Sequence, residues 1–172
     1  QAKIHLSAVT TANSVALLRA AKADGVSITS AVPARHLLLT DQAVDDSVYD
    51  TATRLLPPLR SEADRQACLT GLRDGTIDCI TADHVPYTRI EKELEYMHAK
   101  PGAVGLESAL SAALQALDGD VQVVVRALAA APAAVIGRQQ GLQTGGIADL
   151  VVFDPDGTRE LDAVGRSRGQ NE

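Results

Sequence analysis

Aromatic side chains are scarce in this sequence, which has one Phe, three Tyr and no Trp among 172 residues. Because 45% of the residues are still hydrophobic, we expect a core built from Ala, Leu and Val. Cysteine is also rare: Cys68 and Cys79 form no CxxC pair, which favours reduced thiols over a disulfide framework. No apolar run reaches the roughly 18 residues of a membrane span, and the first residues lack the pattern of a signal peptide. These absences predict a soluble, cytoplasmic protein.

Positive charge is in short supply as well. The sequence has 16 Lys and Arg against 22 Asp and Glu, which gives a net charge of −6 and an isoelectric point near 5.2. This balance argues against a general nucleic-acid binder and against a protein that attaches to anionic membranes. The length fits one ordinary domain or a piece of a larger one.

Residues 3–32 have the pattern of a βαβ unit. Residues 3–9 alternate loosely between apolar and polar and predict a strand. Residues 10–13 offer capping oxygens to a helix that should end before Gly25. The β-branched stretch 26–32 predicts a second strand, which should run parallel to the first.

The middle of the chain is less regular. Residues 33–58 predict a long loop of a kind that is often functional, and Pro57-Pro58 excludes regular helix there. Ser61 should cap a helix that ends near Asp74-Gly75. Further along, the pattern predicts a strand, two helices and a late strand, over residues 77–82, 106–117, 121–130 (ending near Pro132) and 148–154.

Asp83 and His84 follow the predicted strand 77–82, within the stretch TIDCITADHVPY. Polar groups at the carboxyl ends of parallel strands are where α/β proteins usually place their chemistry. Asp83 could bind a metal and take a proton from a metal-bound water. Alternatively, Asp83 caps the next turn and His84 forms an ordinary hydrogen bond. The charged residues 89–100 that follow form either a lid or a solvated surface.

Three strands of this type amount to three-eighths of a (β/α)8 barrel, which needs roughly 250 residues. A small open sheet would leave an edge and one face uncovered. The chain is therefore either a small open α/β domain or the carboxyl-terminal part of a longer protein.

Five segments resemble class I dihydroorotases of the amidohydrolase superfamily. They are HLLLTD (36–41), PPLRSEADR (57–65), GLRDGTIDCITADHVPY (71–87), GAVGLESAL (102–110) and GGIADLVVFDPD (145–156). The resemblance implies an α/β fold in which residues 1–137 form the carboxyl-terminal half of a (β/α)8 TIM-type barrel, about strands six to eight. Residues 138–172 would supply terminal strands of the small β-sandwich beside the barrel. The family's HxH zinc motif is not found in these 172 residues.

The resemblance also implies a chemistry. The family interconverts N-carbamoyl-aspartate and dihydroorotate in pyrimidine biosynthesis, with zinc as cofactor and a metal-bound hydroxide as the nucleophile of hydrolysis. Asp83 matches the family's zinc ligand and catalytic base. Pro101 and Gly102 match a loop whose backbone binds substrate, and residues 57–60 match the turn after a substrate-binding asparagine.

Several of the matching positions carry a different residue here. Ala8 stands at the family's zinc-binding histidine of strand six, Leu56 at the substrate-binding asparagine, and Tyr87 at a substrate-contacting histidine. The family's TPHHL is PARHL at residues 33–37, which keeps only the second histidine, His36. The family's NPAR is replaced in the same way, by Ala131-Pro132-Ala133-Ala134.

This pattern suggests a fold that was kept while catalysis was lost and zinc binding was lost or weakened. It is closest in character to the noncatalytic dihydroorotase-like subunits that assemble with aspartate transcarbamoylase. The expected partners are that enzyme and the chain's own amino-terminal half, in an oligomer, with no nucleic acid and no membrane. An active zinc dihydroorotase with a remodelled site is the first alternative. A free-standing small α/β domain is the second. If the chain is instead half of a barrel, it should on its own expose the inner faces of its strands and aggregate or stay bound to its missing half.

Overall fold

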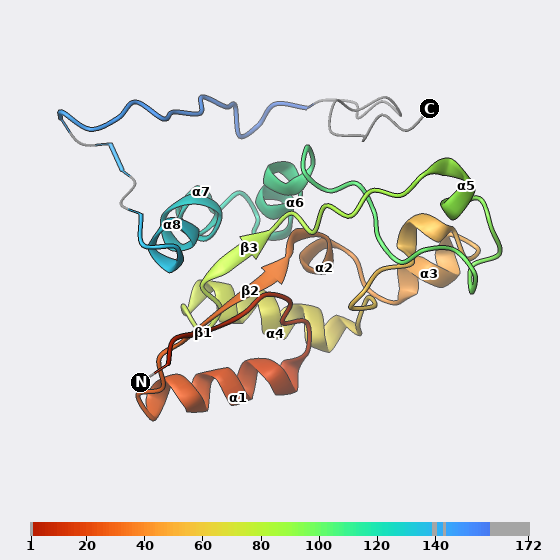
Figure 1. Cartoon of the computed structure of the whole chain (residues 1–172), viewed down its shortest axis with the longest axis horizontal. Coiled ribbons are helices and arrows are strands. Elements are labelled where there is room, and N and C mark those ends of the chain that lie inside the picture. Colours follow the sequence, from red (N-terminus) through yellow and green to blue (C-terminus); the bar gives the residue numbers. More distant parts are fainter. Residues whose placement is uncertain (1, 139–140, 143, 159–172) are drawn as a thin grey trace.

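The computed structural model describes residues 2–138, 141–142 and 144–158, and its centre is a parallel sheet of three strands (Figure 1). The strands follow the chain in the order β1 (Ile4–Leu6), β2 (Ile28–Pro33) and β3 (Cys79–Thr81). Both neighbouring pairs are parallel. The predicted βαβ unit is confirmed, and the third predicted strand extends the sheet.

Helix α1 (Ala12–Ala23) connects β1 to β2 and begins and ends as its sequence predicts. The Thr11 side chain accepts a hydrogen bond from the Ser14 amide at 3.2 Å, which satisfies one of the free amides of the first turn. Gly25 follows the helix with a φ of 76°, a left-handed conformation that glycine adopts without strain.

Helix α4 (Glu62–Arg73) connects β2 to β3 and lies beside α1 (Figure 1). Its cap is Ser61, as predicted, which accepts from the Asp64 amide at 3.3 Å. The Asp64 carboxylate accepts in turn from the Ala12 amide at 2.8 Å. The amino-terminal ends of the two helices are thus joined by a carboxylate that belongs to the first turn of α4 and binds the first amide of α1, at helix ends where the dipoles favour negative charge.

The last helical stretch is longer than predicted. It begins after α6 (Ala109–Ala116) and runs through α7 (Val121–Val125), the π-helical turn η2 (Arg126–Ala130) and α8 (Ala131–Val135). The predicted end near Pro132 is wrong, because Pro132 lies in the first turn of α8, where a helix does not need its missing amide. None of the helices in the described residues is long and apolar enough to cross a membrane.

The hydrophobic core lies where the sheet meets these helices. Its most deeply buried side chains come from β2, α2 (Ala34–Leu38), α4, the start of the third strand segment and α6, and include Val32, Leu37, Leu72, Ile77 and Leu117. All of them are aliphatic, as the composition predicts. Both cysteines are buried and free, and burial raises the pKa of each thiol to about 11, so both stay protonated at neutral pH.

A smaller lobe lies beyond the carboxyl ends of the strands. It contains α3 (Gln42–Asp46), the 3-10 turn η1 (Thr51–Thr53) and α5 (Arg89–Lys92), which come from the loops after β2 and β3. In Figure 1 both α3 and α5 lie at the end of the molecule toward which the arrow of β2 points. A hydrogen bond joins their loops, in which the Thr51 hydroxyl donates to the Lys92 carbonyl at 2.8 Å. The two loops that the sequence marks as functional candidates therefore pack against each other.

The predicted late strand over residues 148–154 does not form. Within residues 144–158 the backbone is extended or turned without pairing to another strand. Ile147 and Val152 are 95% and 97% exposed. The sequence pattern is that of a strand, but a strand needs a partner edge for its backbone groups, and none lies beside it in the described residues. Residues 159–172 of the predicted sandwich segment lie outside the described residues.

The Asp78 carboxylate links the first helix to the sheet and gives a test of the fold. It accepts from Lys22 Nζ and from the Ser30 amide, each at 2.8 Å. We predict that Asp78→Ala lowers the free energy of unfolding by about 2 kcal/mol, because both donors lose a partly buried partner. Urea unfolding of the complete protein measures this, with the exposed Asp24→Ala as control. Equal midpoints for the two variants would contradict the assignment.

Candidate functional site

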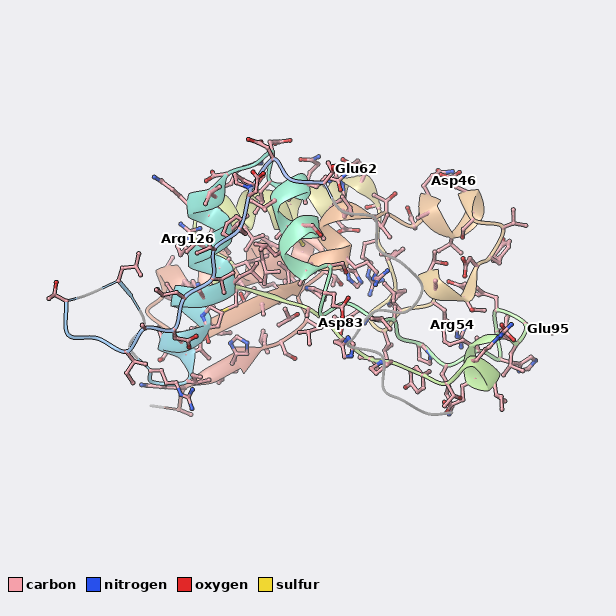
Figure 2. All side chains as sticks on the ribbon, turned by 90° about the horizontal axis from the view of Figure 1, so that it is seen from above. Asp46, Arg54, Glu62, Asp83, Glu95 and Arg126 are labelled. Carbon is pink, nitrogen blue, oxygen red and sulfur yellow. The ribbon has the colours of Figure 1, made fainter. Side chains whose placement is uncertain are left out.

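Asp83 lies just past the carboxyl end of β3, near the centre of the molecule in Figure 2. Its backbone is left-handed, with a φ of 48°, which is uncommon for a residue with a side chain. The carboxylate forms no hydrogen bond or ion pair with another described residue, and Thr88 rather than Asp83 caps the next helix, α5. The alternative in which Asp83 acts as a cap is therefore wrong. Its charge instead reaches Arg35 and His36, raising the pKa of both against the effect of burial.

His84, the neighbour of Asp83, holds the loop that leads into α6. Its Nδ1 accepts two backbone hydrogen bonds, from the amides of Gly105 and Leu106, each at 3.2 Å. Nδ1 therefore carries a lone pair, and the neutral ring has its proton on Nε2. Gly105 is required at this contact, because a Cβ there would lie 2.2 Å from the Ala82 carbonyl oxygen. The alternative in which His84 forms ordinary hydrogen bonds is confirmed.

Gly102 lies beside the strand end but uses its own backbone groups inside the chain. Its amide donates to the Arg54 carbonyl at 2.8 Å, and its carbonyl accepts from Lys92 Nζ at 2.9 Å. A Cβ on Gly102 would lie 2.7 Å from the Val85 carbonyl oxygen, so this close approach also requires glycine. The resemblance implies that Pro101 and Gly102 bind substrate through their backbone. The structure places both beside Asp83's strand, with the Gly102 groups already paired.

Lys92 holds the small lobe together. Its ammonium donates to three backbone carbonyls, those of Thr51, Lys100 and Gly102, at 2.6, 3.0 and 2.9 Å. Burial lowers the Lys92 pKa, and the nearby cations Arg54 and Arg35 lower it further while Asp50 opposes them. The charged segment 89–100 is thus a largely solvated surface that Lys92 fixes to the loop after β2. The sequence marked this segment as charged but could not identify the anchoring lysine, because its partners are backbone carbonyls.

We predict that Lys92→Met loosens the small lobe. The carbonyls of Thr51, Lys100 and Gly102 lose a charged hydrogen-bond donor, while the contacts of the sheet are unchanged. Amide hydrogen exchange of the complete protein should become at least about tenfold faster in residues 51–54 and 100–103, and stay unchanged in α1 and α4. Lys100→Met, an exposed lysine of the same lobe, is the matched control. Unchanged hydrogen exchange in Lys92→Met would show that the three hydrogen bonds of Lys92 are not needed to hold the small lobe in place.

His36 is the most buried ionisable group near Asp83, with only 4% of its surface exposed. Its Nε2 donates to the Pro57 carbonyl at 3.0 Å, which fixes the double-proline turn. Nδ1 is buried and has no hydrogen-bond partner among the described residues. Burial lowers the His36 pKa, while the bond to Pro57 and the charge of Asp83 oppose that shift. The sequence identified His36 only as the histidine that remains of a motif, and its burial comes from the tertiary structure.

Burial of a neutral His36 predicts a pH dependence of stability. The unfolded chain takes up a proton at His36 below about pH 6.5, whereas the folded chain resists it. The unfolded state therefore binds more protons as the pH falls through that value, and stability decreases. We expect a lower free energy of unfolding at about pH 5.5 than at about pH 7.5, and a smaller difference in His36→Gln. His98→Gln, an exposed histidine, is the control and should behave as the unsubstituted protein.

The donors near Asp83 do not by themselves fit a zinc site. Ala8 is exposed just past β1 and offers only a methyl group where the resemblance places a histidine ligand. Among the described residues, no group of three or more His, Cys, Asp or Glu side chains could hold a metal ion. The Asp83 carboxylate and His36 Nδ1 have no hydrogen-bond partner among the described residues, but two such groups are fewer than the three or four protein ligands that zinc takes. A metal here would need ligands from beyond these residues.

The two other changed positions are also visible at the strand ends. Leu56 is 72% exposed and Tyr87 is 37% exposed. Neither can supply the amide or the imidazole that the resemblance assigns to substrate binding. The structure therefore brings Asp83, Tyr87 and the 101–105 loop to one end of the sheet, as the sequence predicts, but with few polar groups free to bind a substrate.

Sequence relatives cover nearly the whole chain. The dihydroorotase of Pelotomaculum thermopropionicum is 43% identical over 176 residues, which is 98% of this chain and 40% of that protein. The dihydroorotase of Caldanaerobacter subterraneus is 39% identical over 175 residues, 99% of this chain and 40% of that protein. These identities support placing the chain in the dihydroorotase family. The chain spans about two-fifths of the length of these dihydroorotases, and no family model matches it.

Solved structures show that the dihydroorotase-like chain has the amidohydrolase barrel fold in part. A dihydropyrimidinase from Brevibacillus agri aligns with a TM-score of 0.71 and 16% identity, over 79% of this chain and 32% of that chain. The inactive dihydroorotase-like domain of a Chaetomium thermophilum CAD-like multifunctional protein aligns with a TM-score of 0.59 and 24% identity, over 81% of this chain and 38% of that chain. The partial parallel sheet thus corresponds to part of the barrel of these TIM-type structures.

Proposed function

We propose that this chain is the carboxyl-terminal part of a dihydroorotase-like protein of pyrimidine biosynthesis that is noncatalytic and serves as a structural partner of aspartate transcarbamoylase. The observation that carries the proposal is the set of side chains at the strand ends. Ala8, Leu56 and Tyr87 occupy positions to which the family resemblance assigns a metal ligand and two substrate-binding groups.

The loss of a ligand at Ala8 is difficult to compensate. Alanine has no lone pair, so a zinc ion bound to the remaining family ligands would need an extra water or a different geometry. His36 Nδ1 also has no hydrogen-bond partner among the described residues, but this atom is buried. The other nitrogen of the same ring, Nε2, is bonded to the Pro57 carbonyl, which fixes the ring in place. Zinc affinity should therefore be weak or absent in the complete protein.

The loop at Gly102 supports the same proposal. A substrate that used the backbone of Gly102 would compete with the bonds to Arg54 and Lys92. Each such bond contributes about 1 kcal/mol net, and more where a charged group is involved. The loop is closed by the chain itself, which suits a fold that is maintained without substrate. The Chaetomium structure, whose description calls it inactive, has a similar fold.

Two surfaces fit the proposed partners. The β1 edge of the sheet, with Ile4 and Leu6 48% and 43% exposed, is suited to pairing with further strands of the same barrel from an amino-terminal half. On the small lobe, Val48, Ile90 and Met97 are each more than three-quarters exposed. Exposed apolar side chains of this kind are typical of protein–protein contacts. We assign this lobe to contact with aspartate transcarbamoylase in an oligomer.

The first alternative is a zinc dihydroorotase with a remodelled site. The unpaired Asp83 carboxylate favours it, because a carboxylate that forms no bond within the chain is free to serve as ligand or base. The second alternative, a free-standing small α/β domain, would require these 172 residues to be stable alone. A monodisperse monomer of this chain in light scattering would favour it.

One experiment separates the proposal from the first alternative. We expect the complete protein to contain less than about one-tenth equivalent of zinc, to lack dihydroorotase turnover, and to co-purify with aspartate transcarbamoylase. Asp83→Asn, which keeps the side-chain shape and tolerates the left-handed backbone, should leave this association unchanged. Stoichiometric zinc together with turnover that Asp83→Asn abolishes would overturn the proposal in favour of the active enzyme.

A further inference from the structure

A cavity of about 340 Å³ lies between α2 and α6. Neither Lys92 nor any of its three carbonyl partners lines it. Its volume is within the range of roughly 300–1,000 Å³ that small-molecule sites occupy. Arg35 and Leu38 line one wall, and one face of α6 with Ser108, Ala112 and Gln115 lines the other. These two helices form the most extensive contact between elements of the fold, so the walls are held firmly.

Arg35 is the only charged side chain that lines the cavity in the described part of the chain. One of its terminal nitrogens donates to the Val104 carbonyl at 2.6 Å. No carboxylate of the described residues lies within ion-pair distance of its guanidinium, and Asp83 acts on it only through its longer-range field. A half-buried guanidinium has five N–H donors, and the cavity side of Arg35 offers those that Val104 does not use.

A half-buried cation without a counter-ion is costly, and burial lowers the pKa of Arg35 accordingly. Arg35 also stands at the first histidine of the TPHHL motif that residues 33–37 resemble. The chain has therefore placed a permanent positive charge at a site lined by no acid. An anion inside the cavity would remove that cost.

The remaining walls decide what kind of anion fits. Ser108, Ser111 and Gln115 lie on one face of α6, at spacings of three and four residues. The Ser108 hydroxyl donates to the Gly105 carbonyl, and the Ser111 hydroxyl donates to the Ser108 carbonyl. The side-chain amide of Gln115 forms no hydrogen bond with another described residue. Between these groups the surface is aliphatic. Such walls suit a ligand with a carbon body and a single charged end.

We propose that the cavity between α2 and α6 binds a small organic carboxylate. The carboxylate pairs with the Arg35 guanidinium, a geometry in which two parallel N–H···O bonds form. The aliphatic body lies against Leu38 and Ala112, and the Gln115 amide offers one further donor at the rim. The proposed ligand is held by Arg35 and α6 and not by the Asp83 carboxylate, although Val104 and Gly105 of the 101–105 loop also line the cavity.

Calorimetric titration of the complete protein with pentanoate tests the proposal, with pentanamide and inorganic phosphate as comparison probes. We expect pentanoate to bind at least about tenfold more tightly than either. Arg35→Gln should weaken pentanoate binding by at least about tenfold. Arg89→Gln, an exposed arginine paired with Glu93 on α5, should change it less than about twofold.

A second variant keeps the charge and fills the space. Ala112→Leu should weaken pentanoate binding while leaving Arg35 in place, and it gives an answer even if Arg35→Gln fails to fold. Equal affinity for pentanoate and pentanamide would overturn the proposal, because the charge would then play no role. Tighter binding of inorganic phosphate than of pentanoate would overturn it as well, since the aliphatic walls would contribute nothing. Unchanged pentanoate binding in both cavity variants would show that the ligand binds elsewhere.

Discussion

The Lys92 ammonium and its three carbonyl partners hold the end of this molecule where the loops after β2 and β3 meet. Long loops at the end of a parallel sheet carry many backbone groups that need partners. Here one side chain serves carbonyls from two loops that lie far apart in the sequence. His84 acts in the same way on the other side of Asp83, by accepting two amides of the loop before α6. These two side chains thus fix the 100–106 loop that lies beside Asp83.

This arrangement has a consequence for function. A catalytic strand end keeps donors and acceptors free for metal and substrate, whereas here most of the polar groups around Asp83 bond to the chain itself. The Gly102 backbone is paired on both sides, and Nε2 of His36 is bonded to Pro57. The Asp83 carboxylate forms no hydrogen bond or ion pair with another described residue. Such a site is compatible with a dihydroorotase-like protein whose contribution is structural.

Electrostatics divide the region into two parts. On one side Asp83 and the neutral, buried His36 lie at the strand end, where any metal would need further ligands. On the other side Arg35 lines a cavity without any acidic side chain among its described lining residues. The Val104 carbonyl accepts a hydrogen bond from one terminal nitrogen of its guanidinium. Arg35 thus provides a positive charge at a cavity that no acidic side chain of the described residues lines.

The sequence by itself determined much of the fold. Thr11, Ser61 and Gly25 mark helix ends through local chemistry, and the β-branched runs mark the strands, because both signals act within a few residues. Residue type and spacing alone were also sufficient to place Asp83 at a strand end. The assignment of Ala8 to a ligand position rests on the family resemblance and stays a prediction.

Only the tertiary structure decided how the site is completed. The partners of Lys92, His84 and Gly102 are backbone groups of distant loops, and backbone groups leave no pattern in the sequence. The extended stretch at residues 148–154 shows the same limit, since its strand pattern cannot form a strand without a partner edge. The cavity at Arg35 likewise exists because α2 and α6 pack together, and the packing leaves the Arg35 side chain half-buried.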